Sequence, residues 1–124
     1  MLKNLKYKYR FLIIINTILS MIISYYILLN PIINNDISFI FNPTFIILTI
    51  YTLMWFLSLY KLYYFKKIGL NIYISLLILG IIMNFLGDIS NFGKFMTILS
   101  LLEHLIIGSI ITLSIYSPIK RYFN

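Results

Sequence analysis

Four uninterrupted apolar runs constrain this chain more than any other feature of its sequence. They cover residues 11–29, 43–62, 68–87 and 95–116. A helix of about 20 residues rises about 30 Å, which is the thickness of the hydrocarbon core of a bilayer. Of the 124 residues, 61% are hydrophobic and only 10% are charged, so water is not the solvent that this composition suits. The pattern predicts one all-α domain over residues 1–124, an integral membrane four-helix bundle with antiparallel up-down topology.

Proline residues mark the ends of the predicted helices. Asn30-Pro31 follows the first run and is expected to stop that helix, because proline cannot continue the backbone hydrogen bonds. Asn42-Pro43 precedes the second run as an N-cap followed by proline at the first helical position. Pro118 comes directly after the fourth run. All three prolines therefore fit the boundaries of membrane-spanning segments.

The basic residues are distributed very unevenly between the two sides of the predicted bundle. Nine of the ten precede the first run, lie where the second run ends and the third begins, or follow the fourth: Lys3, Lys6, Lys8, Arg10, Lys61, Lys66, Lys67, Lys120 and Arg121. Only Lys94 lies on the other side. Short loops rich in Lys and Arg stay in the cytoplasm. We therefore expect a multi-pass protein of the cytoplasmic (inner) membrane with both termini cytoplasmic.

This sidedness also explains the net charge of +7. In a soluble protein such a charge would suggest a nucleic-acid partner. Here it follows the topology of the chain, so we expect no nucleic acid and name the lipid bilayer as the principal partner.

Glu103-His104 is the sharpest feature within the apolar runs, since both residues ionise and both lie inside the fourth run. A charge at the middle of a spanning helix costs about 2.5 to 3.5 kcal/mol on insertion scales. Ser100, His104, Gly108 and Thr112 follow one another at intervals of four, so they share one face of the helix. We expect this face, with Glu103 on its flank, to point into the protein.

Antiparallel tracing places other polar and small side chains at the depth of Glu103. Asn84 is the first expected partner, and Ser100 completes the predicted intramembrane polar site. In one interpretation Glu103 is neutral and simply bonds across helices; in the other it relays a proton or cation, or contacts a substrate. Because the chain has no Ala, close helix packing is expected at the residues Gly80, Gly108, Ser20 and Ser24.

Most enzyme chemistry is poorly supported by the sequence. The chain has no Cys and a single His, and it contains no G-x-S-x-G elbow and no glycine-rich phosphate loop. One His, one Glu and the loop residues Asp36 and Asp88 do not make an obvious metal site. We therefore expect no catalytic residues, no cofactor and no metal.

Two functions stay open after these exclusions. The favoured one is a non-catalytic accessory protein or subunit, which packs against itself in a homo-oligomer or against a larger membrane complex. The alternative is a small oligomeric transporter or channel that uses Glu103 and His104 as an intramembrane pair.

Overall fold

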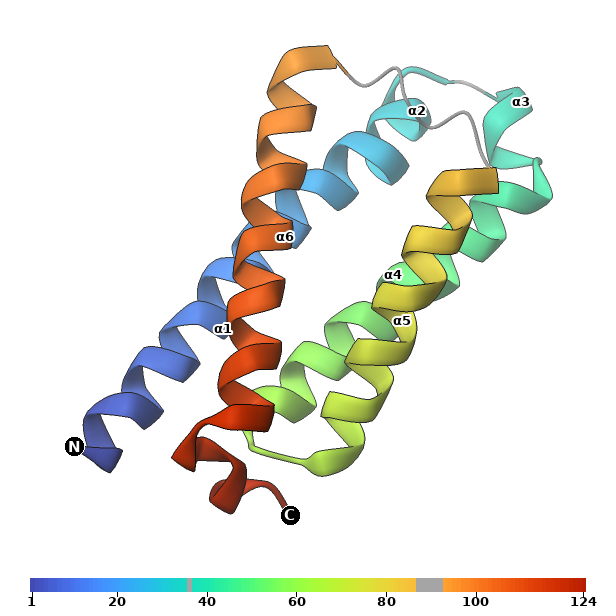
Figure 1. Ribbon diagram of the computed structural model, residues 1–124. Coiled ribbons are helices and arrows are strands. Elements are labelled where there is room, and N and C mark those ends of the chain that lie inside the picture. Colours follow the sequence, from blue (N-terminus) through green and yellow to red (C-terminus); the bar gives the residue numbers. More distant parts are fainter. Residues whose placement is uncertain (36, 87–92) are drawn as a thin grey trace.

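The computed structural model describes residues 1–35, 37–86 and 93–124, without the side chains of residues 31, 39 and 84–86. Within these ranges the regular structure is helical throughout, with no strand. Figure 1 shows four long helices that run alternately up and down: α1 (Leu2–Ser24), α4 (Pro43–Tyr63), α5 (Lys67–Leu86) and α6 (Gly93–Tyr116). The prediction of an all-α, antiparallel four-helix bundle is confirmed.

Three of the helical segments described are long and apolar enough to cross a membrane, namely Leu2–Leu29, Pro43–Tyr63 and Gly93–Tyr116. Helix α5 contributes a shorter apolar stretch, Lys67–Met83. The predicted third run extends to Gly87, which lies outside the described residues. The fold is therefore that of a helical membrane protein.

The first helix does not end at Asn30-Pro31, and this prediction was wrong. A π-helical turn, η1 (Tyr25–Leu29), follows α1 and leads directly into the short helix α2 (Asn30–Ile33). In η1 the Asn30 N–H donates to the Tyr25 carbonyl five residues earlier. This wider turn carries the helix to Pro31 without the hydrogen bond that proline cannot donate. The helical path therefore extends several residues beyond the predicted stop.

Two caps begin helices where the sequence contains suitable polar residues. The Asn42 side chain accepts a hydrogen bond from the Thr44 N–H at the start of α4, as its position before Pro43 predicted. Ser117 accepts from the Ile119 N–H at the start of a 3₁₀ turn, η2 (Pro118–Tyr122). A further short helix, α3 (Ile37–Ile40), lies between α2 and α4. Side-chain oxygens thus satisfy amides that would otherwise lack helical partners.

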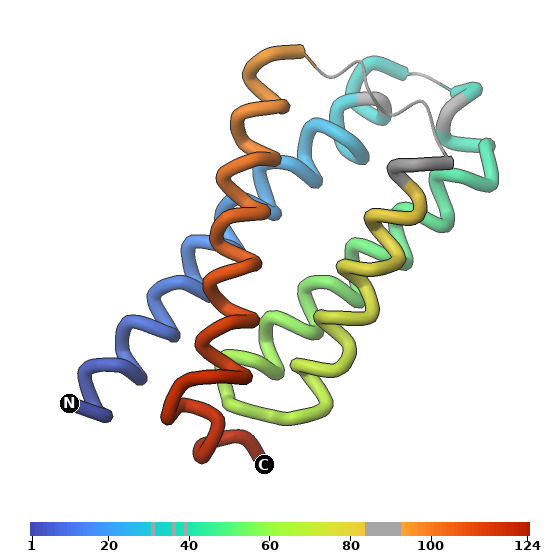
Figure 2. The backbone as a smooth tube through the Cα atoms, viewed as in Figure 1, coloured from blue at the N-terminus to red at the C-terminus, as the bar shows by residue number. Residues whose placement is uncertain are grey.

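The four long helices form two close pairs, α1 with α6 and α4 with α5. The pairs converge at the end of the bundle that carries both termini and the α4–α5 connection, and they separate toward the opposite end (Figures 1 and 2). Helix α1 also contacts α4, whereas α5 and α6 touch little. Packing between the two pairs is therefore concentrated at one end.

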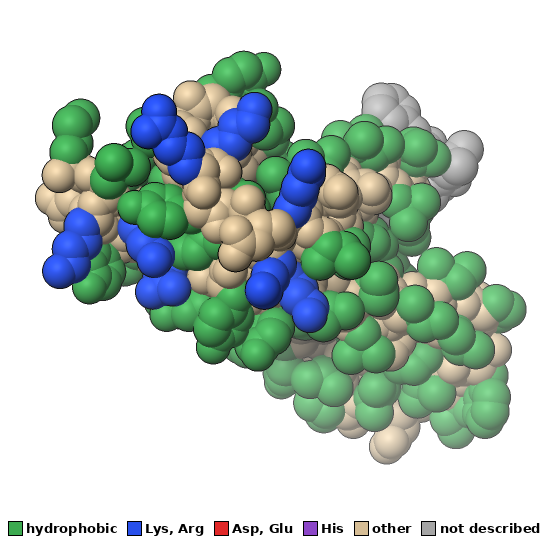
Figure 3. All heavy atoms as spheres, turned by 90° about the horizontal axis from the view of Figure 1, so that it is seen from below, with side chains coloured by type: hydrophobic (Ala, Val, Ile, Leu, Met, Phe, Trp, Pro, Cys, Tyr) green, Lys and Arg blue, Asp and Glu red, His purple; other side chains and the backbone are tan. Residues whose placement is uncertain are grey.

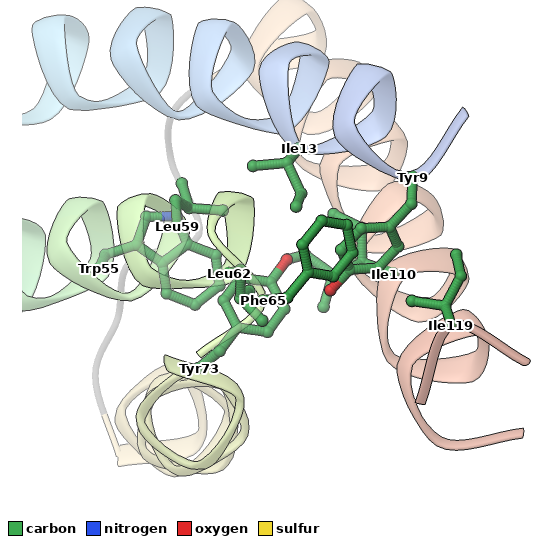
Figure 4. Close-up of a cluster of buried hydrophobic side chains, with 10 residues drawn as sticks. Tyr9, Ile13, Trp55, Leu59, Leu62, Phe65, Tyr73, Ile110 and Ile119 are labelled. Atoms are coloured by element: carbon green, nitrogen blue, oxygen red, sulfur yellow. The ribbon is translucent and has the colours of Figure 1, made fainter. Parts of the chain in front are cut away.

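The core lies where the two pairs meet (Figure 4). Tyr9 of α1 is fully buried and stacks on Phe65 of the α4–α5 connection, with ring centroids 5.4 Å apart. The Tyr9 hydroxyl lies 2.8 Å from Ser114 Oγ, and Ser114 itself donates to the Ile110 carbonyl. Since a hydroxyl has one proton, Tyr9 is the donor to Ser114. This contact ties α1 to α6.

The C-terminal segment closes this end of the bundle. The Asn124 N–H donates to the Phe65 carbonyl, and the Lys67 N–H donates to the Asn124 carbonyl. Phe65 adopts a positive φ of 56°, an unusual conformation for a residue with a side chain. Its ring is buried among Tyr9, Tyr122 and Phe123, so packing from α1 and from the C-terminal segment holds this conformation in place.

Candidate functional site

A chain of hydrogen bonds joins three helices near the middle of the bundle. The indole Nε1–H of Trp55 on α4 donates to Ser20 Oγ on α1 at 2.9 Å. Ser20 in turn donates to Glu103 Oε1 on α6 at 2.5 Å. An indole N–H can only donate, so it occupies an acceptor site on Ser20 and leaves the serine proton for the carboxyl group. The hydrogen bonds therefore run, from donor to acceptor, from α4 through α1 to α6.

Trp55 is held in place by two tyrosine rings. The Tyr73 ring of α5 stacks on it with centroids 4.7 Å apart, and the Tyr51 ring stacks at 6.2 Å. The Tyr51 hydroxyl donates to the Leu76 carbonyl at 2.8 Å, which links α4 to α5. Figure 4 shows Trp55 and Tyr73 side by side in the core. The ring stack orients the indole N–H toward Ser20.

A second buried polar contact brings α5 into the same region. The Asn16 side chain of α1 is fully buried and donates from Nδ2 to the Tyr73 hydroxyl at 2.6 Å. Asn16 Oδ1 is buried without a hydrogen-bond partner among the described residues. Asn16 precedes Ser20 by one helical turn, so both polar residues lie on the inner face of α1. The polar cluster, defined as Asn16, Ser20, Trp55, Tyr73 and Glu103, therefore includes all four long helices.

Glu103 and His104 do not form a pair, contrary to the sequence-based expectation. Glu103 is half-buried and bonds Ser20, whereas His104 is exposed on the outside of α6. The Nδ1 atom of His104 lies 2.6 Å from the Ser100 carbonyl of its own helix. Because a carbonyl only accepts, Nδ1 carries the proton that it donates to Ser100.

The polar stripe of Ser100, His104, Gly108 and Thr112 was expected to face inward, and this was wrong for most of its members. His104, Gly108 and Thr112 are exposed, and Ser100 is half-buried. Helix α6 instead buries a face with spacings of three and four around Glu103: Met96, Leu99, Ile107, Ile110 and Ser114. Each residue adds about 100° of rotation, so the residue after Glu103 is turned to the flank of the helix.

The remaining predicted site residues are dispersed. Ser20 is buried in the polar cluster, while Ser24, one turn later, is half-buried and bonds no other described residue. A Cβ at Gly80 would lie 2.6 Å from the Tyr51 hydroxyl, so this glycine admits a close contact with α4. A Cβ at Gly108 would meet nothing within 4 Å in this chain. The side chain of Asn84, the first expected partner of Glu103, lies outside the described residues.

Two important residues were missed by the sequence analysis. Tyr73 stacks on Trp55 and bonds Asn16, and it is the only aromatic residue in the apolar stretch Lys67–Met83. Its position as a lone aromatic residue in this stretch was the sequence feature that could have identified it. Gly69 admits the closest approach of α5 to α4, with a hypothetical Cβ 2.5 Å from Lys61 Cβ. Its position as the third residue of α5 did not distinguish it in the sequence.

The chemistry available to the polar cluster is limited. Its one carboxyl group is held by a serine hydroxyl, and His104 is turned away from it. Among the residues described, no group of three or more His, Cys, Asp or Glu could hold a metal ion. The cluster therefore has the composition of an interhelical hydrogen-bond network.

We expect Ser20→Ala to weaken the bundle, because it removes the central link between Trp55 and Glu103. Both partners then lose a hydrogen bond in a buried or half-buried position, at a cost of about 1 to 3 kcal/mol. Equilibrium unfolding in mixed micelles measures this loss. Ser24→Ala is the matched control on the same helix and should be near neutral. Equal stability of the two variants would show that the chain of hydrogen bonds contributes little.

The fold and the cluster define a class, that of helical membrane proteins with a polar network between spans. No known family model matches the chain, and neither a curated protein nor a solved structure is similar to it.

Proposed function

We propose that this chain is a non-catalytic accessory subunit of a membrane complex, held in the cytoplasmic (inner) membrane as a multi-pass protein with both termini cytoplasmic. The observation that carries this proposal is the exposed polar stripe on α6. His104, Gly108 and Thr112 face outward on a helix apolar enough to span a membrane. Small and polar residues on such a surface favour close packing against another helix.

The chemistry of His104 supports a protein neighbour on this face. The ring is exposed, its Nδ1 bonds Ser100, and its Nε2 has no hydrogen-bond partner among the described residues. In hydrocarbon this nitrogen would have no hydrogen-bond partner, which is unfavourable. Gly108, one turn away with open space around it, would let the backbone of a second helix approach. The neighbour can belong to a second copy of this chain or to a larger complex.

The orientation rests on the basic residues. Nine of the ten lie in α1 before Phe11, in or beside the α4–α5 connection, and in the C-terminal segment, which share one end of the bundle. The positive-inside rule assigns that end to the cytoplasm. Fusion of a reporter that is active only in the cytoplasm to the C-terminus tests this assignment.

The alternative function, an oligomeric transporter or channel, depends on the intramembrane acid. Glu103 is the only carboxyl group within the membrane-spanning helices described, which favours this alternative in principle. Its bond to Ser20 and its separation from His104 weigh against a working pair. Glu103→Gln preserves an oxygen acceptor for Ser20, so the accessory function should survive this change.

The experiment places a photoreactive amino acid at position 104 of the full chain in native membranes, with position 102 as the control. Leu102 is also exposed but lies about 200° around α6 from His104. We expect a crosslinked product of one defined mass from position 104, at least about fivefold more abundant than from position 102. Equal crosslinking from both positions would contradict an interface on the polar stripe.

Variants separate the two functions. In the accessory protein, Glu103→Gln leaves crosslinking from position 108 unchanged, whereas His104→Leu reduces it, with both variants present in the membrane at normal abundance. Loss of the cellular phenotype or of a flux in Glu103→Gln, with its abundance and crosslinking intact, would instead favour the transporter.

A further inference from the structure

The end of the bundle that carries both termini gathers the positive charge of the protein. Figure 3 views this end directly and shows Lys and Arg side chains scattered among hydrophobic ones over a large part of it, with no acidic side chain in view. The sequence agrees, because none of the three acidic residues occurs in α1, in the α4–α5 connection or after α6. The basic side chains at this end therefore have no Asp or Glu beside them in the sequence.

Lys6 and Arg10 differ from the other basic residues because aromatic rings hold them in place. They lie one turn apart on α1, so they share a face, and both are half-buried. Lys6 Nζ lies 5.3 Å from the Phe65 ring centroid and 4.9 Å from that of Tyr122. Arg10 Cζ lies 4.9 Å from the Tyr63 ring and 5.4 Å from the Phe65 ring. The end of α4, the α4–α5 connection and η2 thus supply the rings that position the two cations. The Phe65 ring lies near both of them.

The hydrogen-bonding capacity of Arg10 is unused. Its guanidinium makes no hydrogen bond or ion pair within the part of the chain that the structure describes, and its Nε is buried without a partner. A guanidinium carries five N–H donors and prefers carboxylate or phosphate oxygens. Two neighbouring cations also repel each other until an anion lies between them. An anionic oxygen at this position would accept from Arg10 and reduce the repulsion between the two cations.

An apolar strip on α1 begins beside this pair and continues into the membrane. Ile14, Ile18 and Met21 are all exposed, at 45%, 52% and 58%, and lie within about 80° of Arg10 around the helix axis. From Arg10 to Met21 the helix rises about 16 Å, which is close to half of the hydrocarbon core. One acyl chain has this reach. A free phosphate ion would make no use of the strip.

We infer that Lys6 and Arg10 bind the phosphate of an anionic phospholipid, whose acyl chain lies along Ile14, Ile18 and Met21. Arg10 lies directly before the first apolar run, which is the depth at which lipid phosphates meet the hydrocarbon. The rings of Tyr63, Phe65 and Tyr122 hold the two cations in position before the lipid arrives. The phosphate site is therefore preorganised. It differs in this from the other basic residues, which attract anionic lipid only through their charge.

The test measures lipid retention by native mass spectrometry of the full chain, released from vesicles of phosphatidylglycerol and phosphatidylcholine. The variant Lys6→Gln with Arg10→Gln removes the two anchored cations. Lys3→Gln with Lys8→Gln removes two exposed cations from the same helix and has the same net charge. Each basic residue near a membrane surface contributes about fivefold to anionic lipid binding.

Both pairs share this general contribution, and only the first pair also bonds the phosphate directly. We therefore expect the first pair of changes to reduce phosphatidylglycerol retention at least about tenfold more than the control pair does. Equal losses would overturn the inference, since they indicate a diffuse field. Displacement of the lipid by millimolar inorganic phosphate would also overturn it, because the site would then recognise phosphate alone. If the double variant fails to fold, the comparison of Lys6→Gln with Lys3→Gln decides, with an expected loss at least about threefold greater for Lys6→Gln.

Discussion

Replacing Trp55 with alanine is expected to destabilise the bundle more than any other single change in the polar cluster. The indole is buried, stacks between Tyr51 and Tyr73, and donates to Ser20. Truncating a buried tryptophan to alanine costs about 3 to 5 kcal/mol of the free energy of unfolding, because the removed ring leaves a cavity. Equilibrium unfolding in mixed micelles, followed by far-ultraviolet circular dichroism, measures the loss.

Trp55→Phe separates packing from hydrogen bonding. Phenylalanine keeps a ring between the two tyrosines but cannot donate to Ser20. We expect it to cost about 1 kcal/mol, the size of an interhelical hydrogen bond in a membrane. If Trp55→Phe were as destabilising as Trp55→Ala, the indole N–H would be the dominant contribution, and the emphasis on ring packing would be wrong.

The second large effect is expected at Gly69, where α5 approaches the end of α4. A Cβ there would lie 2.5 Å from Lys61 Cβ and 2.9 Å from the backbone nitrogen of Leu62. A backbone atom cannot rotate aside as the end of a side chain can, so Gly69→Ala must push the two helices apart. Such overpacking costs about 1 to 3 kcal/mol. The same unfolding assay measures it.

The opening of the α4–α5 pair can be detected directly. Because the chain has no cysteine, introduced cysteines at Leu53 and Ile78, both exposed, carry spin labels without competition. We expect Gly69→Ala to lengthen or broaden the distance between the two labels.

Gly108→Ala is the matched control for this change. No atom lies within 4 Å of its hypothetical Cβ, and alanine favours a helix over glycine by about 0.8 to 1 kcal/mol. The purified chain should therefore keep or gain stability, while crosslinking to a partner through the α6 stripe should fall. Similar losses of stability in both glycine variants would show that the close approach at Gly69 does not determine the helix pairing.

The sequence of α6 alone does not decide which face of this helix is buried in the bundle. Glu103 and His104 are adjacent, and either residue could direct the polar side of the helix inward. The structure buries Met96, Ile107 and Ile110 with Glu103, because these residues contact the other helices at intervals of three and four. His104 is left outside, where Ser100 satisfies one of its nitrogens.

The hydrogen-bond partner of Glu103 could be predicted from the sequence only in part. Depth along antiparallel helices correctly placed Ser20 near Glu103, since rise per residue and span boundaries can be counted in the sequence. Depth in the membrane does not distinguish Ser20, Ser24 and Asn84 as partners of Glu103, because the rotation of each helix about its axis decides which side chains meet. The donation of Trp55 to Ser20 depends on the ring of Tyr73, which comes from a distant part of the chain.

The sequence by itself determined the helical class, the four long helices, the cap at Asn42 and the gathering of positive charge at one end. These properties depend on local hydrophobicity, helix length and charge, which are additive along the chain. Only the tertiary structure decided that Glu103 bonds Ser20, that His104 faces outward, that Gly69 admits the closest helix contact and that Arg10 rests on two rings. Such contacts depend on how each helix is rotated about its axis, and packing among residues far apart in sequence sets that rotation.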